Sequence, residues 1–371
     1  MDEKNTNYIN RTLKKVDPSI ARIFMPWILK HPKSLYAMMK LAKSYRKSRK
    51  VRGEELIKGL KVPPFLILSI TSNCNLKCVG CYAAATGNLC KQKSKNSLDM
   101  EQWISIIKEA KELGVFAFII AGGEPFLLPN LLKISEQFRD NLFLIFTNGT
   151  MLRTQDIEKL KRLRNTIIMV SIEGDQDLTD NRRGSGVYEK VVKTINELDN
   201  KGVISGISVT INRKNVKYWM KFKNIDDLIS RGIRLAFLLE YIPVDNDLEL
   251  MLTHEESRKF REIVLDYREN KEIFIVHSPG DEEYMGGCVS AGRGFAHVTP
   301  LGDLTPCPVS NIATHNLTKS SLREGLDSEL FRVIRESEHL LETNGSPCAL
   351  FSHSEEVNAL VKKVKAYRTS V

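Results

Sequence analysis

The stretch Thr71-Ser-Asn-Cys-Asn-Leu-Lys-Cys-Val-Gly-Cys-Tyr82 places three cysteines within eight residues, directly after an apolar run over residues 65–70. Three and two residues separate Cys74, Cys78 and Cys81, so one loop can wrap a small cubane of iron and sulfide. Three thiolates bind three irons, whereas iron-sulfur clusters usually have four cysteine ligands. The spacing therefore predicts a catalytic 4Fe-4S cluster with one iron left open to a substrate or cofactor.

A zinc site is the alternative for this triplet. Zinc generally takes four nitrogen or sulfur ligands, often as two CxxC pairs. A CxxxCxxC triplet without a nearby second pair fits that pattern poorly. Cys90 is the nearest further cysteine, and we expect it to be a free loop thiol.

Outward from the triplet, short apolar runs alternate with helical stretches, which is typical of repeated β-α units and a parallel sheet. The apolar runs cover residues 65–70, 115–121, 142–146, 167–172, 204–211 and 233–241, and the helical stretches cover 100–113, 131–139, 154–163, 188–201 and 216–231. Six units are fewer than the eight of a closed barrel. We expect an α/β fold with a partial (β/α)6 barrel over residues 63–243, whose open side would admit a large substrate.

The cysteine triplet after the first strand of a partial barrel resembles the signature of the radical S-adenosylmethionine (SAM) superfamily. The resemblance implies that the open iron chelates the amino and carboxylate groups of SAM. It also implies that the reduced cluster passes one electron to the sulfonium, so that a 5'-deoxyadenosyl radical forms and abstracts hydrogen from unactivated carbon. An electron donor such as flavodoxin or ferredoxin would be a partner.

The ends of the later strands resemble the family's SAM-binding elements. Residues 121–125 match its GGEP element, which bonds the SAM amino group, and residues 171–174 match its serine-x-acid-glycine element. Arginine suits bidentate carboxylate recognition, and a polar residue that ends the fifth strand often reaches the ribose. The cofactor-binding residues implied are Tyr82, Gly122, Gly123, Glu124, Pro125, Ser171, Glu173, Arg182, Arg183 and Asn212. The alternative for those after the third strand is a hydrogen-bonded turn or a solvated loop.

One position departs from the family. The residue before the third cysteine is commonly aromatic and packs near the adenine, whereas this chain has Gly80 there. We expect Tyr82 to take over that packing.

The distal cysteines form a second pattern. Cys288, thirteen residues, Gly302, four residues and Cys307 reproduce the opening of the auxiliary-cluster domains called SPASM and Twitch. Residues 298–307 resemble their β-hairpin, and Cys348 completes a set of three metal ligands. Because the further dense cysteine run of a full SPASM domain is missing, a Twitch-like domain with one auxiliary iron-sulfur cluster is expected over residues 244–371. That cluster has either an open iron or a ligand other than cysteine; the alternative is three buried structural thiols.

Length, cysteine content and charge limit the possible location and partners of the protein. The chain has 371 residues, seven cysteines and a net charge of +10. Without a secretory signal or an apolar stretch long enough to span a bilayer, we expect it in the cytoplasm, with metal or redox chemistry for its cysteines. Seven Lys or Arg residues and no acid lie between Lys40 and Arg52, inside a basic helical lead-in over residues 1–62.

Two interpretations compete for residues 20–52 of this lead-in. A basic amphipathic helix can contact an anionic membrane, which would place the protein at the inner membrane face and deliver an apolar, membrane-derived substrate. The alternative is a helical arm packed over the open barrel. Nucleic-acid binding is not expected, because no stacking platform is visible.

The sequence thus predicts a radical SAM enzyme acting on a small, apolar or membrane-derived molecule. A peptide or protein side chain, the common substrate of SPASM enzymes, is the alternative substrate. A non-catalytic iron-sulfur or zinc scaffold is the alternative from another class.

Overall fold

The computed structural model of the chain describes residues 23–25, 28–29, 33–89, 97–244, 247–343 and 345–369. Cys90 and most of residues 1–32 lie outside these residues. The strands of the main sheet are β1 (Phe65–Ser69), β2 (Ala117–Ala121), β3 (Leu142–Thr147), β4 (Thr166–Ser171), β5 (Ser205–Ile211), β6 (Leu235–Glu240), β7 (Phe274–Ser278), β8 (Phe295–Val298), β9 (Asp303–Thr305) and β11 (His315–Asn316). Their order is β11-β9-β8-β1-β2-β3-β4-β5-β6-β7.

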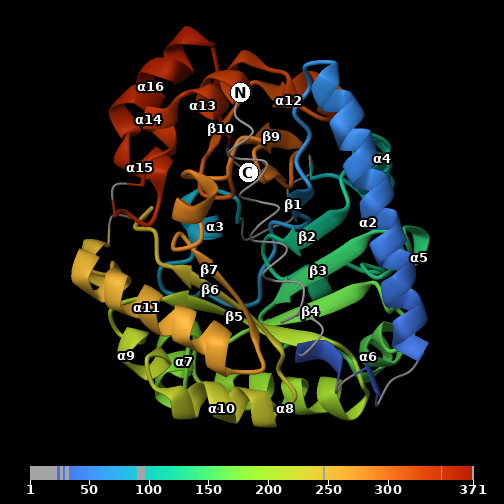
Figure 1. The fold of residues 1–371 in the computed structure, drawn as a ribbon, viewed down its shortest axis with the longest axis vertical. Coiled ribbons are helices and arrows are strands. Elements are labelled where there is room, and N and C mark those ends of the chain that lie inside the picture. Colours follow the sequence, from blue (N-terminus) through green and yellow to red (C-terminus); the bar gives the residue numbers. More distant parts are fainter. Residues whose placement is uncertain are drawn as a thin grey trace.

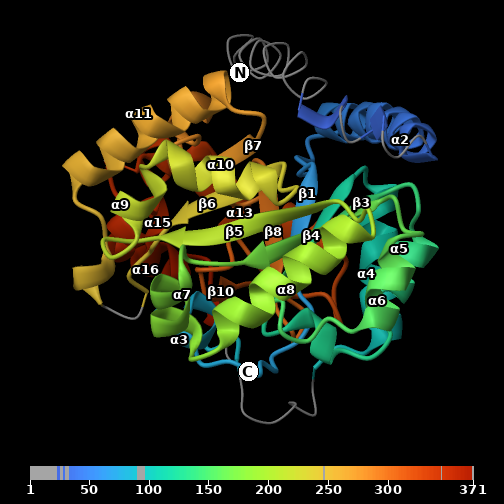
Figure 2. The same cartoon turned by 90° about the horizontal axis from the view of Figure 1, so that it is seen from below.

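The strands β1 to β7 pair in parallel and in chain order, as Figure 1 shows. All six predicted strands are present, each with ends within two residues of the predicted ones. The helices between them are α4 (Met100–Glu112), α5 (Lys133–Gln137), α6 (Thr154–Leu160), α7 (Gln176–Arg183), α8 (Val187–Asn200), α9 (Val216–Trp219) and α10 (Phe222–Ser230). Figure 2 shows α4, α5, α6, α8 and α10 arranged around the strands. The partial barrel is therefore confirmed.

Local sequence explains why these elements form. Asp99 and Gln102 make a reciprocal capping box at the start of α4, which satisfies backbone N–H groups that the first turn leaves unpaired. The next apolar residues recur every three or four positions and are buried: Trp103, Ile106, Ile107 and Ala110. The predicted helix over 216–231 is instead two helices, because Lys221 between them has an extended backbone.

Two strands take places in the sheet that the sequence did not predict. After α11 (His254–Asn270), β7 adds a seventh parallel strand beside β6, where the apolar rhythm was expected to stop. The strand β8 pairs in parallel with β1 and antiparallel with β9. The expected hairpin around Gly302 is therefore present, and it extends the barrel sheet. Strands from both sides of residue 243 share one sheet.

The C-terminal region surrounds this hairpin with short elements. They are β10 (Ile312–Ala313), β12 (Tyr367–Arg368), α12 (Leu322–Leu326), α13 (Glu329–Glu336), α14 (Glu338–Leu341), α15 (Ala349–Ser352) and α16 (Ser354–Lys363). The strands β10 and β12 form a separate two-stranded sheet. Single-turn elements are α3 (Tyr82–Ala85), η1 (Pro125–Leu127), η2 (Leu248–Leu250) and η3 (Glu283–Met285).

The basic helix α2 (Lys33–Ile57) lies beside α4 and α5 (Figure 1). It falls within the helical lead-in expected over residues 1–62. Arg52 donates to the carbonyl of Gly114 at 2.6 Å, and Lys40 pairs with Asp140 at 2.9 Å. Gly114 and Asp140 lie just before β2 and β3, so α2 covers the N-terminal ends of the strands. The cysteine triplet follows β1 and therefore lies at the C-terminal ends of the strands, away from these contacts of α2. Among the described residues, no helix combines the length and hydrophobicity needed to cross a membrane.

Candidate active site

The cysteine triplet lies in the loop between β1 and α3, and the glycine pair after β2 packs directly against it. A Cβ on Gly123 would lie 1.9 Å from the carbonyl oxygen of Asn73, and one on Gly122 would lie 2.6 Å from that of Thr71. Gly123 and Glu124 donate their backbone N–H groups to the same two carbonyls, at 2.7 and 2.8 Å. Only glycine permits this approach, so the pair fixes the cysteine loop against the end of β2.

The three thiols suit a cubane better than a single metal ion. They lie close enough to influence one another electrostatically, and a backbone N–H of Leu76 donates to Cys74. Burial raises the pKa of Cys74 to about 11 and raises that of Cys78, so their thiolates need a cation. Zn–S bonds of about 2.3 Å would bring the sulfurs within about 3.8 Å of one another. In the described part of the chain, neither thiol triplet has all its sulfurs within 4.8 Å.

Glu124 connects the ends of β2 and β3. Its buried carboxylate accepts hydrogen bonds from Thr147 Oγ1 and the Asn148 N–H, both at 2.7 Å, and from the Phe126 N–H at 3.0 Å. Burial raises the pKa of this carboxyl, and these donors oppose the rise. Pro125 begins η1 directly after it. The expected SAM-binding segment is thus held rigidly beside the cysteine loop.

Glu173 brings the two candidate arginines together. Its Oε1 accepts from Arg182 at 2.6 Å and from Arg183 at 2.5 Å, and the three side chains are almost wholly buried. The Arg182 carbonyl accepts from the Val79 N–H at 2.9 Å, and its guanidinium donates to the Gly80 carbonyl at 3.3 Å. The C-terminal end of α7 is therefore fastened to the cysteine loop.

This arrangement also affects the thiol chemistry. Burial raises the pKa of Cys78, and the positive charges of Arg183 and Arg182 oppose that rise. Both arginines therefore favour a thiolate at Cys78. The sequence predicted a SAM carboxylate as their partner, whereas in this structure both bind Glu173.

Asn212 and Ser171 end neighbouring strands. Asn212 accepts from the Lys214 N–H at 2.9 Å through its side chain, and its own N–H donates to Asn215 Oδ1 at 2.9 Å. It therefore takes part in a hydrogen-bonded turn at the end of β5. Ser171 ends β4 and pairs in register with Ser208 on β5.

An aromatic ring does lie at the position where the family's pattern is broken. Gly80 has a φ of +65°, and a Cβ there would lie 2.7 Å from Cε2 of Tyr241, the residue after β6. Tyr82, the residue expected to fill this place, has its hydroxyl near the thiols of Cys81 and Cys307; burial, followed by those two thiols, raises its pKa. Sequence reasoning missed Tyr241, although its place just after a predicted strand was a usable signal.

The distal cysteines also come together. Cys348 and Cys288 both act electrostatically on Cys307, and Cys348 acts on Cys288. Burial raises the pKa of all three thiols, that of Cys348 to about 11. Backbone N–H groups donate to each sulfur: Ser290 to Cys288, Val309 to Cys307, and Leu350 and Phe351 to Cys348. Such donors stabilise the thiolates of iron-sulfur sites and tune their potentials.

A hydrogen-bonded chain joins the two thiol sets. His297 on β8 bonds Ser69 on β1 through Nε2 and Thr305 on β9 through Nδ1, each at 2.7 Å. Thr305 donates to the carbonyl of Cys307 at 3.2 Å. Burial lowers the pKa of His297 to about 3, so the ring stays neutral. The strand that leads into the first triplet is thereby linked to a cysteine of the second.

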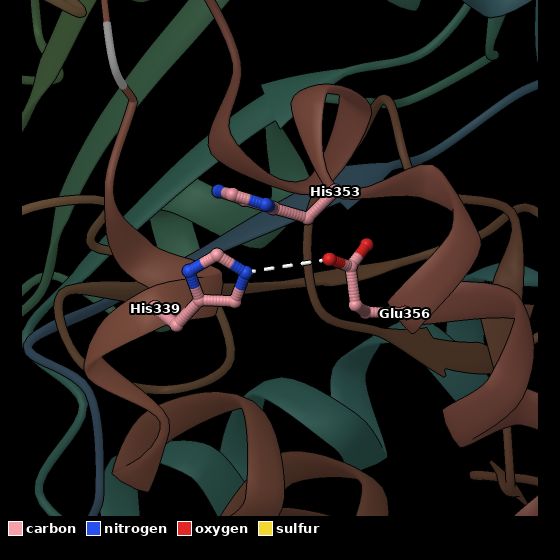
Figure 3. Close-up of side chains that lie close together, drawn as sticks. All are labelled: His339, His353 and Glu356. Atoms are coloured by element: carbon pink, nitrogen blue, oxygen red, sulfur yellow. Dashed lines mark hydrogen bonds and ion pairs between the residues drawn. The ribbon is translucent and has the colours of Figure 1, made fainter.

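Figure 3 shows a third polar group, formed by His339, His353 and Glu356. His339 Nε2 pairs with Glu356 at 3.3 Å, and the His339 and His353 rings have centroids 4.2 Å apart. His353 Nε2 also bonds the Glu342 carbonyl at 3.2 Å. Two imidazoles and a carboxylate are ligands of zinc type, yet His339 and Glu356 already pair and are more than half exposed. We interpret the group as a clamp between α14 and α16.

Comparison with known proteins identifies the barrel. Residues 68–237 match the family model of the radical SAM superfamily. These residues therefore form a radical SAM domain. The family implies SAM and a 4Fe-4S cluster as cofactors, and the matched residues contain the first cysteine triplet and every expected SAM-binding residue.

Relatives extend the similarity beyond the barrel. The chain is 26% identical over 313 residues to the AdoMet-dependent heme synthase of Methanosarcina barkeri, covering 77% of this chain and 88% of that protein. It is 25% identical over 300 residues to the mycofactocin maturase MftC of Mycobacterium tuberculosis, covering 76% and 75%. Streptococcus suis SuiB bound to its precursor peptide SuiA has the same fold, with a TM-score of 0.65 and 19% identity over 79% of this chain and 71% of SuiB.

Proposed function

We propose that this radical SAM enzyme modifies a peptide side chain, using the cluster on Cys74, Cys78 and Cys81 and an auxiliary cluster on Cys288, Cys307 and Cys348. The observation that carries the proposal is that the two thiol sets approach the same residue, since Cys81 and Cys307 both act electrostatically on Tyr82. A bound cluster with SAM supplies one-electron chemistry that removes hydrogen from unactivated carbon. The chain's own residues hold, orient and shield the reactants.

Within this site the expected residues other than Tyr82 have proposed tasks. Gly122, Gly123, Glu124 and Pro125 offer SAM a rigid edge beside the cysteine loop, supported by their bonds to Thr71 and Asn73. Glu173 holds Arg182 and Arg183 against that loop, and the two arginines favour the thiolate of Cys78. Ser171 and Asn212 would reach the ribose from the ends of β4 and β5. Tyr241 is added as the ring beside the adenine, because it lies against Gly80.

The peptide is preferred over a membrane-derived molecule because of where α2 lies. Its anchors, Gly114 and Asp140, are at the N-terminal ends of the strands, whereas the cysteine triplet follows the C-terminal end of β1. A membrane held by α2 would face away from the reacting site. MftC and SuiB, a maturase and an enzyme that binds a precursor peptide, support the same choice.

A tetrapyrrole is the second candidate substrate. The heme synthase of M. barkeri matches over 88% of its own length, and a macrocycle would also use the open side of a partial barrel. Such a molecule is both large and apolar, so it agrees with the substrate class predicted from the sequence.

Paired cysteine variants test the two clusters. After anaerobic reconstitution we expect roughly eight irons in the wild-type chain and roughly four in either triple alanine variant. Cys74/Cys78/Cys81→Ala should release no 5'-deoxyadenosine from SAM on reduction. The matched Cys288/Cys307/Cys348→Ala variant should still release it but fail to modify substrate. Full SAM cleavage by the first variant, or zinc in place of iron, would overturn the proposal.

Substrate class is tested with the reconstituted enzyme, SAM, a flavodoxin or ferredoxin as electron donor, and extract of the source cells. We expect the extract to stimulate release of 5'-deoxyadenosine, and protease treatment of the extract to remove the stimulation. Stimulation that resists protease and follows the pigmented organic extract would instead support the tetrapyrrole.

We keep peripheral membrane contact through residues 20–52 as a proposal about tethering. The exposed Leu35, Tyr36 and Met39 lie on α2 among its basic residues. Each basic residue near an anionic surface contributes about 1 kcal/mol. Co-sedimentation with phosphatidylserine vesicles should weaken when Lys43, Lys47 and Lys50 are changed to Gln; equal pelleting of both proteins contradicts tethering.

A further inference from the structure

The auxiliary thiol set contains a fourth potential ligand. Glu282 follows β7, and its carboxylate is in hydrogen-bonding contact with the Cys288 thiol. Its charge acts on all three distal thiols: it appears among the electrostatic influences on Cys288, Cys307 and Cys348. One carboxylate therefore lies within electrostatic range of all three distal thiols.

The loop that carries Glu282 is built to hold it there. Its carbonyl accepts from the N–H groups of Met285 and Gly287, at 3.0 and 2.9 Å, so the chain turns around this residue just before Cys288. Ser278 Oγ donates to its Oε1 at 3.2 Å. Gly287, in turn, packs so closely on α14 that a Cβ would lie 2.5 Å from the Leu341 carbonyl. A carboxylate fixed from both sides loses little freedom on binding a metal.

The neighbouring residue and a nearby arginine strengthen the arrangement. Asp281 pairs with Arg268 at 2.8 Å and accepts from the His277 N–H at 2.9 Å, which ties the loop to α11 and β7. Arg293 donates to the carbonyls of Cys288, Met285 and Gly286. Its guanidinium therefore brings positive charge to a site where up to four anionic ligands gather.

Electrostatics explains why a carboxylate in this place favours a metal. A buried carboxylate beside thiols is unfavourable unless a cation neutralises it. Iron accepts carboxylate as well as thiolate ligands. Three cysteines leave one iron of a cubane without a protein ligand, and the Glu282 carboxylate can supply that fourth ligand.

We propose that Glu282 is the fourth protein ligand of the auxiliary cluster. The inference depends on the auxiliary cluster of the proposed function and extends it. It means that this cluster is fully coordinated by the chain, so it serves electron transfer or structure and does not bind substrate at an open iron. The reacting molecule then meets only the first cluster, through SAM.

The test uses the full-length chain with Cys74, Cys78 and Cys81 changed to alanine, so that every iron signal comes from the auxiliary site. Glu282→Ala, Glu282→Cys and the control Glu272→Gln are compared in this background; Glu272 is exposed and precedes β7. The readouts are iron per chain, Mössbauer and EPR spectra, and the spectral change on adding cyanide, which binds an open iron.

We expect roughly four irons and no response to cyanide in the parent and in Glu272→Gln. Glu282→Ala should lose one iron to mild oxidation, giving a three-iron EPR signal, and should respond to cyanide before that loss. Glu282→Cys should restore a four-iron cluster that neither loses iron to mild oxidation nor responds to cyanide. That result would exclude misfolding as the cause of the changes in Glu282→Ala. Equal oxidation and cyanide responses in all four proteins overturn the assignment, as does an open iron in the parent. If the parent binds no iron at all, the chain has no auxiliary cluster and the proposed function fails. The iron count distinguishes this outcome from a failure of the Glu282 assignment alone.

Discussion

The ring of Tyr241 occupies the space that a side chain at position 80 would need. Gly80 combines a positive φ of +65° with a Cβ position 2.7 Å from Cε2 of Tyr241. Gly80→Ala should therefore cost more than the roughly 1 kcal/mol of the backbone conformation. We expect less iron bound at the first triplet and weaker SAM binding, measured by iron analysis and calorimetry in the variant without distal cysteines.

Gly186→Ala is the matched control, because Gly186 has a φ of +74° with no atom within 4 Å of the added Cβ. It should keep wild-type iron. Gly80→Ala combined with Tyr241→Ala should recover part of the iron if the clash is the cause. Identical losses at positions 80 and 186 would mean that the backbone conformation alone explains the effect.

Glu173 neutralises two buried guanidinium groups, so its replacement leaves both uncompensated. Glu173→Gln should lower the free energy of unfolding by about 3–5 kcal/mol, as measured in urea under anaerobic conditions. Glu158→Gln removes an ion pair with Lys201 in which both side chains are more than 40% exposed. It should cost less than about 1 kcal/mol. A similar small loss for both variants would contradict a clamping role for Glu173.

His297 makes the fold sensitive to acid. Its pKa is about 3 in the folded chain against 6.5 in the unfolded one, so below pH 6.5 only the unfolded chain takes up the proton. Stability from this group is complete above pH 6.5 and falls by about 1.4 kcal/mol for each pH unit below it. His297→Gln, which does not titrate, should flatten the decline in unfolding free energy between about pH 7 and about pH 5.

The exposed His254 provides the comparison for this effect. His254→Gln should leave the pH profile unchanged. If the profiles of the wild type and His297→Gln run parallel, the buried imidazole is not the cause of the acid sensitivity.

Arg52 anchors α2 through a 2.6 Å hydrogen bond to the Gly114 carbonyl. Arg52→Met should destabilise the chain by about 1–3 kcal/mol, because that carbonyl loses a charged donor. Proteolysis should then cut α2 faster. Lys43→Met removes an exposed charge of the same helix and should leave the cleavage rate unchanged; equal acceleration in both variants would argue against the anchor.

The barrel strands could be predicted because each is a continuous apolar run bounded by turn residues, as expected for strands buried on both faces. The strand β7 was not predicted because its five residues include His277 and Ser278, whose polar groups interrupt the apolar run. Its histidine is nevertheless buried, since Glu240 on β6 bonds it at 3.0 Å. Polar pairs of this kind depend on contacts distant in sequence, and periodicity does not report them.

The candidate site, like the fold, has features that the sequence could indicate and features that it could not. The prediction of the first cysteine triplet as cluster ligands depends on spacing within one loop, and that of two distal cysteines depends on the hairpin motif. Contacts between loops were not accessible: Tyr241 against Gly80, Glu173 between two arginines, and Glu282 beside Cys288 join residues from 6 to 161 positions apart. Such pairs become visible only when the sheet order is known.

The pairing of β8 with β1 determines when the main sheet can be completed during biosynthesis. Because β1 precedes the first cysteine triplet and its partner β8 ends at residue 298, one edge of β1 stays unpaired until most of the chain has left the ribosome. Unpaired edges attract other chains, and pairing across such separations is slow. A nascent enzyme therefore needs protection of that edge, and iron delivered before the last third is made would meet a loop without its final support.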